Sequence, residues 1–399
     1  MISPGIAPIS GFSSAGRYAV IFAAALSVLM KNRSTVLAYD AVPTLFLGIF
    51  ITFHSILFSP IVDVSALKSI SWTISMLTVI TAWRQLSHDD WDAVSLQVFR
   101  SLILVMVVSL PLLVLPLGYL VNGTGFQGIL NHPQAMGPTL ALLGAWSASQ
   151  MFGSKRPPWH VVILVIVCVV LVLLSEARTA GLALLGGFSF AALCVSLLSK
   201  RRLVSTLPGL FSPRFGLITV VGVVLLSLFG SKFLGNIASY ISKRGEASNL
   251  MEAYQGSRGY LIDAMQANIS MSPWQGIGFG IASIPEAMVV TRDPMLGLPI
   301  GAAIEKGVMP LAVLEELGIP GFIFVAVWIA SVLRRSARGG VASLSVALTV
   351  LLLNLGENTL FSAGGFGMLP IILLGWAITS ADHLSPVRHA PNRRMTQPA

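Results

Sequence analysis

Long apolar segments recur along most of this chain, and they limit its possible folds more than any other feature of the sequence. Residues 161–174 form one continuously apolar run. Stretches of about 17 to 25 apolar residues match the length that a helix needs to cross about 30 Å of hydrocarbon. A membrane β-barrel would instead show segments of about ten residues that alternate apolar and polar side chains. Because a helix satisfies its backbone hydrogen bonds within its own segment, the sequence predicts an all-α membrane protein.

The predicted fold is a polytopic transmembrane helical bundle with about eleven spans. Mean hydropathy is +0.82 and charged residues make up 10% of the chain, as expected when lipid is the solvent. The spans are predicted at residues 18–30, 36–58, 69–86, 101–121, 135–152, 159–175, 179–199, 215–234, 309–333, 341–360 and 366–381. Residues 1–399 then form a single integral membrane domain. Within it, residues 235–308 form a long polar loop that is predicted to contain short interfacial helices.

Basic residues indicate how the spans are oriented, because Lys and Arg collect in cytoplasmic loops. When the predicted spans alternate, the basic clusters fall on one side of the membrane, at Lys31/Arg33, Lys155/Arg156, Lys200/Arg201/Arg202, Arg214, Arg334/Arg335/Arg338 and Arg388/Arg393/Arg394. We expect this side to be cytoplasmic and to hold the C-terminus and a solvated loop at 88–92, whereas the loop at 235–308 lies on the outer face. The net charge of +9 therefore reflects topology and not nucleic-acid binding, because the sequence has no basic patch interleaved with aromatic residues.

Two of the arginines on the predicted outer side, where the positive-inside rule disfavours basic residues, are functional candidates. Arg178 lies in a short connection between two strongly apolar helices, and Arg258 lies in the long loop. An ionisable residue near membrane depth is costly and is therefore a functional candidate. For Arg178 a plainer interpretation is also open, in which the side chain reaches the lipid headgroups or pairs with Glu176.

Acidic residues gather just before and within the ninth predicted span. Glu305 and Lys306 precede the adjacent pair Glu315 and Glu316. The helix dipole favours a carboxylate near the start of a helix, but two carboxylates entering the membrane cost more than the dipole returns. One of the two is therefore expected to have a buried partner, such as an arginine of the outer face.

Other candidates lie in turns on the same predicted face. Gly276, Gly278 and Gly280 alternate along the long loop, and such glycines can let backbone amides form a nest for a phosphate. A simple turn between interfacial helices explains them equally well. His132 opens the fifth predicted span, either as a base or phosphate donor or as part of an ordinary helix-entry turn. Glu357 stands near the end of the tenth predicted span.

These elements, in this order, resemble the O-antigen ligase and Wzy-type O-antigen polymerase superfamily, which are membrane glycosyltransferases of the GT-C type. The resemblance covers roughly residues 120–325. It is carried by Gly-Phe-Gln and Asn-His-Pro within 125–133, Ser-Glu-Ala-Arg-Thr-Ala at 175–180, Arg258 with Pro-Trp-Gln-Gly-Ile-Gly-Phe-Gly at 273–280, and Glu-Leu-Gly-Ile-Pro-Gly at 316–321. The resemblance implies that Arg178 and Arg258 bind the diphosphate of an undecaprenyl-diphosphate-linked glycan, and guanidinium forks suit that role.

The resemblance also implies a reaction in which an acceptor hydroxyl attacks the anomeric carbon of the donor directly, with inversion. The residues expected to take part in catalysis are Arg178, Arg258, Glu305 and Glu316. The residues expected to bind substrate are His132, Lys306, Gly276, Gly278, Gly280 and Glu357. No metal, cofactor or nucleotide is expected, and the sequence has no HExxH, CxxC or GxSxG motif.

One departure from the family pattern bears on the acceptor. Ligases typically carry a His about nine residues before the Glu of the Glu-x-Gly-x-x-Gly element, and here that position is Gly307. Glu305 as a base or Lys306 as a charge are the open replacements. The missing His favours an exopolysaccharide-type polymerase in a bacterial inner membrane over a ligase that acts on the lipid A core. A polysaccharide transporter or flippase is the other alternative, but its charges would be expected near the bilayer midplane.

Overall fold

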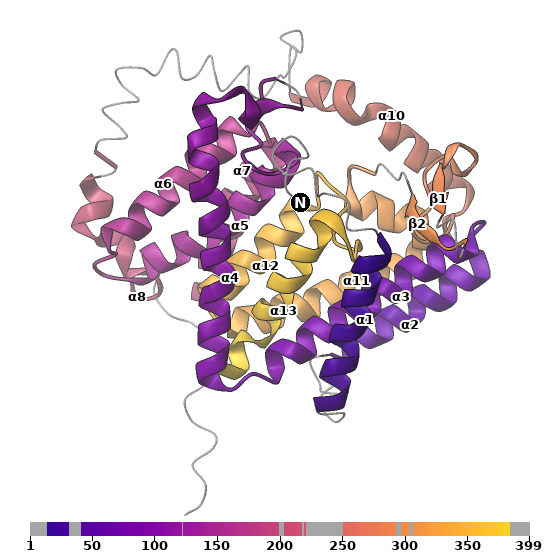
Figure 1. Cartoon of the computed structure of the whole chain (residues 1–399), viewed down its shortest axis with the longest axis horizontal. Coiled ribbons are helices and arrows are strands. Elements are labelled where there is room, and N and C mark those ends of the chain that lie inside the picture. Colours follow the sequence, from indigo (N-terminus) through magenta and orange to yellow (C-terminus); the bar gives the residue numbers. More distant parts are fainter. Residues whose placement is uncertain are drawn as a thin grey trace, which may run out of the picture.

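The computed structural model describes residues 14–31, 41–121, 123–198, 203–217, 219–220, 250–292, 297–302 and 306–383. Most of the predicted span at 215–234 lies outside the described residues. Helices make up most of the described part (Figure 1). In chain order the elements are α1 (Ser14–Lys31), α2 (Val42–Phe58), α3 (Val62–Arg84), α4 (His88–Ser109), η2 (Leu110–Val114), η3 (Pro116–Tyr119), α5 (Pro133–Gly153), α6 (Trp159–Leu174), α7 (Arg178–Leu198), α8 (Leu203–Thr206), η4 (Pro208–Phe211), α10 (Leu250–Met271), η5 (Pro285–Ala287), β1 (Val290–Arg292), β2 (Pro299–Ala302), α11 (Met309–Arg338), α12 (Val341–Leu353), η6 (Gly365–Gly367) and α13 (Met368–His383).

Helices α2 and α3 form a tight antiparallel hairpin. Ser59 is extended, with φ −80° and ψ 134°, because the ring of Pro60 disfavours a helical residue before it. The chain then re-enters the bundle at Val62, so the predicted start of this span at residue 69 is wrong. The segment from Val62 to Lys68, which lies outside the predicted spans, is the first part of a helix.

Helix α4 begins at His88, which corrects the predicted loop at 88–92. The Ser87 hydroxyl accepts a hydrogen bond from the Asp90 amide at 3.2 Å, and this contact satisfies one of the free amides at the helix start. Asp89 and Asp90 lie in the first turn, where the positive end of the helix dipole stabilises their negative charge. Beyond Ser109 the chain continues as short 3₁₀ turns, and the predicted helix at 101–121 is therefore wrong at both ends.

The last three helices follow the predicted spans, with two local differences. Helix α11 is broken at Gly318, whose φ of 65° and ψ of −173° are accessible essentially only to glycine. Helix α12 ends at Leu353, several residues before the predicted end at 360. It ends there because the Asn354 side chain accepts hydrogen bonds from the backbone amides of Thr359 and Leu360, at 2.9 and 2.8 Å. These bonds turn the chain away from the helix axis.

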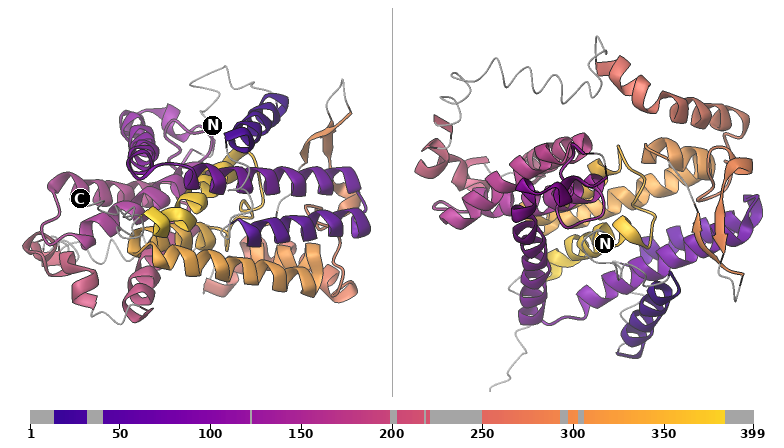
Figure 2. Two further views of the ribbon diagram at one scale, coloured as in Figure 1. Left: turned by 90° about the horizontal axis from the view of Figure 1, so that it is seen from below. Right: turned by 45° about the horizontal axis from the view of Figure 1, so that its top comes forward.

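The loop predicted at 235–308 differs from a series of short helices only. Its described part contains one long helix, α10, then the short η5 and a two-stranded antiparallel hairpin in which Val290 pairs with Ala302. The prediction of a purely α-helical chain is therefore wrong at this hairpin. Figures 1 and 2 show α10 along the edge of the bundle, with the hairpin beside the ends of α2 and α3.

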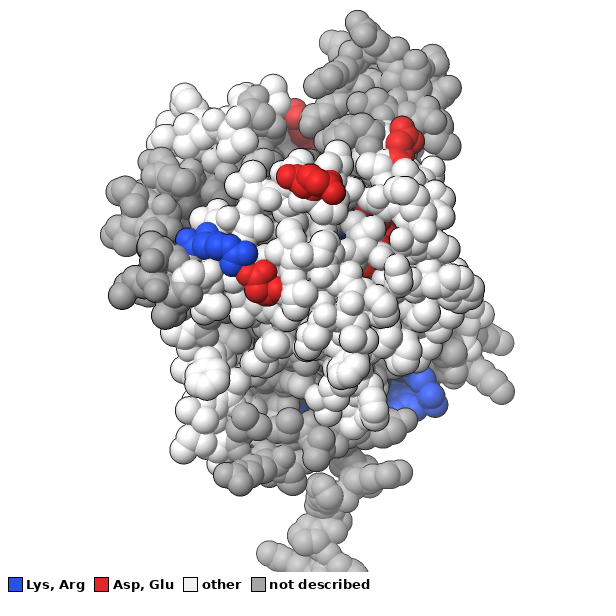
Figure 3. Space-filling view, turned by 90° about the vertical axis from the view of Figure 1, so that its right-hand side faces the viewer, with Lys and Arg blue, Asp and Glu red and all other residues white. Residues whose placement is uncertain are grey.

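Four helices in the described part are long and apolar enough to cross a membrane, namely those at Val62–Arg84, His88–Val114, Arg178–Leu197 and Met309–Arg338. Five shorter apolar helices accompany them, at Ala19–Val28, Val42–Phe58, Trp159–Leu174, Val341–Leu353 and Met368–His383. Many large apolar side chains on these helices are exposed, for example Phe46 and Phe53 on α2 and Val327 on α11. The face in Figure 3 is mostly uncharged, with a few separate acidic and basic side chains. This is the fold of a helical membrane protein.

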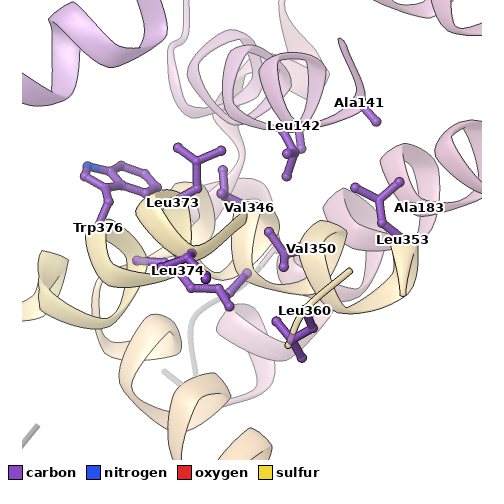
Figure 4. Close-up of a cluster of buried hydrophobic side chains, with 14 of the residues drawn as sticks. Ala141, Leu142, Ala183, Val346, Val350, Leu353, Leu360, Leu373, Leu374 and Trp376 are labelled. Carbon is purple, nitrogen blue, oxygen red and sulfur yellow. The ribbon is translucent and has the colours of Figure 1, made fainter. Parts of the chain in front are cut away.

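A continuous hydrophobic core joins the helices. Figure 4 shows part of it, where side chains of α5, α7, α12 and α13 meet. Small residues allow close helix packing: a Cβ on Gly187 of α7 would collide with Thr349 of α12, and one on Gly144 would lie 3.0 Å from Leu184. Cys168 is fully buried in this core, where a thiol behaves as a small apolar group.

Candidate functional site

Most of the segments that the sequence analysis singled out meet at one end of the bundle, which we call the loop end. It consists of the turn at 59–61 and the described parts of the connections at 123–132, 175–177, 272–308 and 354–367. Helix α11 runs from this end to the opposite one, which carries basic side chains at Lys155, Arg156, Arg334, Arg335 and Arg338. The connection between α5 and α6 and the start of α12 lie together at that opposite end.

The connection that carries Arg178 is packed into the loop end. The Phe126 amide donates to the Leu174 carbonyl at 2.8 Å, and the Thr124 hydroxyl donates to the Glu176 carboxylate at 3.2 Å. Glu176 has a φ of 55°, and it is the sole described residue other than glycine with a positive φ. Such a conformation costs free energy and is held by its surroundings. The half-buried Arg178 follows as the first residue of α7.

Neighbouring helices contact the same connection through glycines. A Cβ on Gly137 of α5 would lie 2.8 Å from the Ser175 hydroxyl, and one on Gly356 would collide with Thr179. Glu357 comes next to Gly356 and is half-buried. The segments around 124–137, 175–180 and 354–361, which are far apart in the sequence, are therefore in contact.

The segment at 354–361 also joins this region to the start of α11. The Met309 amide donates to the Asn354 carbonyl at 3.0 Å, and the ring of Phe361 lies edge-on to that of Phe279, with centroids 5.8 Å apart. The Trp72 indole donates to the Leu360 carbonyl at 3.0 Å. These contacts link the arginine-bearing connection to the loop around 272–283.

A buried ion network occupies the start of α11. The Lys306 ammonium lies 2.7 Å from Glu315 Oε2 and 3.1 Å from Glu316 Oε1. All three residues are at most 3% exposed. Glu315 also accepts hydrogen bonds from Asn268 of α10, at 2.7 Å, and from Ser283, at 3.2 Å. The carboxylates therefore have the buried partner that the sequence predicted, but this partner is a lysine and not an arginine.

The residues at 276–280, which we call the glycine loop, hydrogen-bond to Glu315 and Glu316 of α11. Gly276, Gly278 and Gly280 have φ values of 63°, 106° and 68°. The Ile277 and Gly278 amides donate to the backbone carbonyls of Glu315 and Glu316, at 2.9 and 3.0 Å. The Gly280 amide donates to the Glu316 carboxylate at 2.6 Å. The glycines thus form a turn whose backbone amides hydrogen-bond to α11. The anion that contacts this turn is the Glu316 carboxylate, where the sequence suggested a phosphate.

Three polar residues that the sequence analysis missed support the glycine loop from the α2–α3 hairpin. The His54 Nε2 donates to the Gln275 carbonyl at 2.7 Å, and the Ser65 hydroxyl donates to the Phe279 carbonyl at 2.6 Å. The Lys68 ammonium lies 5.2 Å from the centroid of the Phe279 ring. Lys68 could have been identified from the sequence. Like Arg178, it lies between two apolar stretches on the predicted outer side, where the positive-inside rule disfavours a basic residue.

The other predicted site residues have different outcomes. His132 caps α5, where its Nδ1 accepts a hydrogen bond from the Gln134 amide at 3.0 Å, in agreement with the helix-entry interpretation. Arg258 belongs to α10, but its side chain lies outside the described part of the chain. Glu305 lies outside it entirely. The catalytic and substrate-binding roles themselves stay predictions.

No cluster of metal-ligating side chains occurs among the described residues. No protein-family model matches the chain, and no curated protein matches it closely. The fold and the loop end thus define a helical membrane protein in which ionisable side chains gather at the end of the bundle opposite the basic connections.

Proposed function

We propose that this protein transfers a glycan from undecaprenyl diphosphate to a hydroxyl group of another carbohydrate, at the loop end of the bundle. The observation that supports this proposal most is that four segments, distant in the sequence, lie at the loop end and are joined there through the segment at 354–361. These segments, at 125–133, 175–180, 273–280 and 316–321, resemble the motifs of the O-antigen polymerase and ligase superfamily. The proposal places the loop end on the periplasmic side, because the opposite end carries the basic connections.

In the proposed reaction, Arg178 and Arg258 bind the donor diphosphate. The acceptor oxygen bonds to the anomeric carbon as the bond between that carbon and the phosphate oxygen breaks. The hydroxyl proton passes to a base, and undecaprenyl diphosphate leaves with the bonding electrons. Guanidinium groups are well suited to the negative charge that develops on the departing diphosphate, and stabilising that charge is where an enzyme gains most. The residues on either side of Arg178 are closely packed, which would restrict its movement in this role.

The acceptor distinguishes the two forms of the proposal. A polymerase adds the glycan to another repeat unit, whereas a ligase adds it to the lipid A core. We favour the polymerase, because Gly307 stands where ligases of the superfamily carry a histidine.

The proposal is tested with purified protein, an undecaprenyl-diphosphate-linked oligosaccharide and a matching acceptor. We expect longer glycan and released undecaprenyl diphosphate without any ion gradient, which a transporter would not give. Arg178→Ala and Arg258→Ala should each slow transfer by about 10²- to 10³-fold, as for the loss of one charge-stabilising donor. Arg334→Ala, an exposed arginine at the opposite end of α11, is the matched control and should transfer normally. Unchanged transfer in both the Arg178→Ala and the Arg258→Ala variant would refute the proposal.

A further inference from the structure

The ion network at the start of α11 joins side chains from parts of the chain that are distant in the sequence. Lys306 precedes α11, Glu315 and Glu316 lie just before the break at Gly318, and Asn268 belongs to α10. Through Glu316 the network also reaches the amide of Gly280. It therefore ties α10 and the glycine loop to the same point of α11.

The charges of the network are balanced only when Lys306 is present. Lys68 of α3 is near enough to Glu316 and Lys306 to interact electrostatically with both. A Cβ on Gly280 would lie 2.9 Å from its ammonium, so Lys68 borders the network directly. Lys68 thus adds a second basic side chain beside the two carboxylates. Without Lys306, Glu315 would keep an uncompensated buried charge, which is strongly destabilising.

We propose that Lys306 is a positioning residue: it neutralises Glu315 and Glu316 so that the glycine loop and α10 can dock on α11. This role differs from the substrate contact that the sequence suggested for Lys306. Its ammonium is almost completely buried between two carboxylates, and a side chain that binds substrate needs a face open to that substrate. The consequence for catalysis rests on the proposed function, because α10 is the helix that carries Arg258.

The close packing around the network supports this role. A Cβ on Gly276 would lie 2.6 Å from the Glu315 carbonyl, and one on Gly318 would collide with the Trp274 carbonyl. The Ile319 amide donates to the Pro273 carbonyl at 2.9 Å. The glycine loop thus lies directly on the broken turn of α11. Repulsion between two unneutralised carboxylates in that turn would displace the loop.

Hydrogen exchange of the full-length protein in detergent tests the docking directly. The amides of Ile277, Gly278 and Gly280 are hydrogen-bonded to Glu315 and Glu316, so exchange in the peptide 272–283 reports whether the loop is docked. We expect Lys306→Met to speed this exchange by about tenfold or more. The double variant Lys306→Met/Glu315→Gln restores the balance between Lys68 and Glu316, and its exchange should return to the wild-type rate. Lys155→Met, an exposed lysine at the opposite end, should change nothing.

Transfer activity then separates positioning from substrate binding. If Lys306 is a positioning residue, Lys306→Met abolishes transfer. The double variant Lys306→Met/Glu315→Gln then recovers both transfer and slow hydrogen exchange. Recovery of slow exchange without recovery of transfer would mean that Lys306 contacts substrate, and would overturn the inference. So would an unchanged exchange rate in Lys306→Met. If the single variant cannot be purified, a double variant that also fails to fold would overturn it. Absence of transfer in the wild-type protein refutes only the proposed function, since the exchange rates still decide the docking.

Discussion

At the scale of single residues, Gly318 has the clearest steric requirement in the structure. Its backbone angles suit only glycine, and a Cβ would meet the Trp274 carbonyl. The break that it makes in α11 lets the Glu315 and Glu316 carbonyls accept hydrogen bonds from the glycine loop. Two other glycines allow backbone strain to be separated from steric collision. Gly340 has a φ of 92° but open space around its Cβ position, and Gly153 has open space and no positive φ.

We therefore predict a graded loss of stability in three alanine variants. Gly318→Ala should lower the unfolding free energy by about 3 kcal/mol or more, because strain and collision add. Gly340→Ala should cost about 1 kcal/mol from its backbone angle alone, and Gly153→Ala should be nearly neutral or slightly stabilising. Thermal unfolding in detergent ranks the three. An equal effect of Gly318→Ala and Gly340→Ala would show that the collision with Trp274 contributes nothing.

Site residues differed in how well the sequence could predict them. Arg178, Glu315 and Glu316 stand out because a charge next to apolar spans needs a reason. Asn268 and His54 do not stand out, because a polar residue near a helix end is common. Their importance arises from partners that are distant in the sequence. Asn268 bonds to Glu315, 47 residues away, and His54 bonds to Gln275, 221 residues away. A single sequence carries no signal for such pairs.

At the scale of elements, hydropathy located the helices but not their ends. The start of α4 depends on the Ser87 cap, and the end of α12 depends on Asn354. Both are polar contacts of single side chains, whereas hydropathy averages over about 20 residues. The β1–β2 hairpin was missed for a related reason: its strands are three and four residues long, which is too short to show an alternating pattern.

Asn354 allows a prediction about the end of α12. The residue is 1% exposed, and its side-chain oxygen accepts from two backbone amides, while its amide group donates to the Val350 carbonyl at 2.8 Å. Asn354→Ala leaves these buried groups without partners, so the unfolding free energy should fall by about 3 kcal/mol. Gln150→Ala, an exposed amide on α5, is the control. Similar thermal stability of the two variants would mean that Asn354 does not fix the turn.

At the scale of the whole molecule, the sequence predicted a helical membrane protein, and the structure has that fold. Hydropathy and charge are averaged over long segments, so they predict this fold class without knowledge of the contacts between residues. These averages do not predict which connections are in contact. Those contacts depend on how the helices pack through small residues such as Gly187. The contacts at the loop end therefore had to come from the structure.

The proposed function requires that Arg178 and Arg258 hold the same diphosphate. Binding of undecaprenyl diphosphate to the purified protein, measured for the wild type, both alanine variants and the double variant, tests this requirement most directly. We predict that each single variant binds about 10- to 100-fold more weakly, as expected for lost charge-assisted hydrogen bonds. The loss in the double variant should differ from the sum of the two free-energy changes, because both arginines act on one ligand. Strictly additive losses, or no loss in one single variant, would contradict a shared diphosphate site.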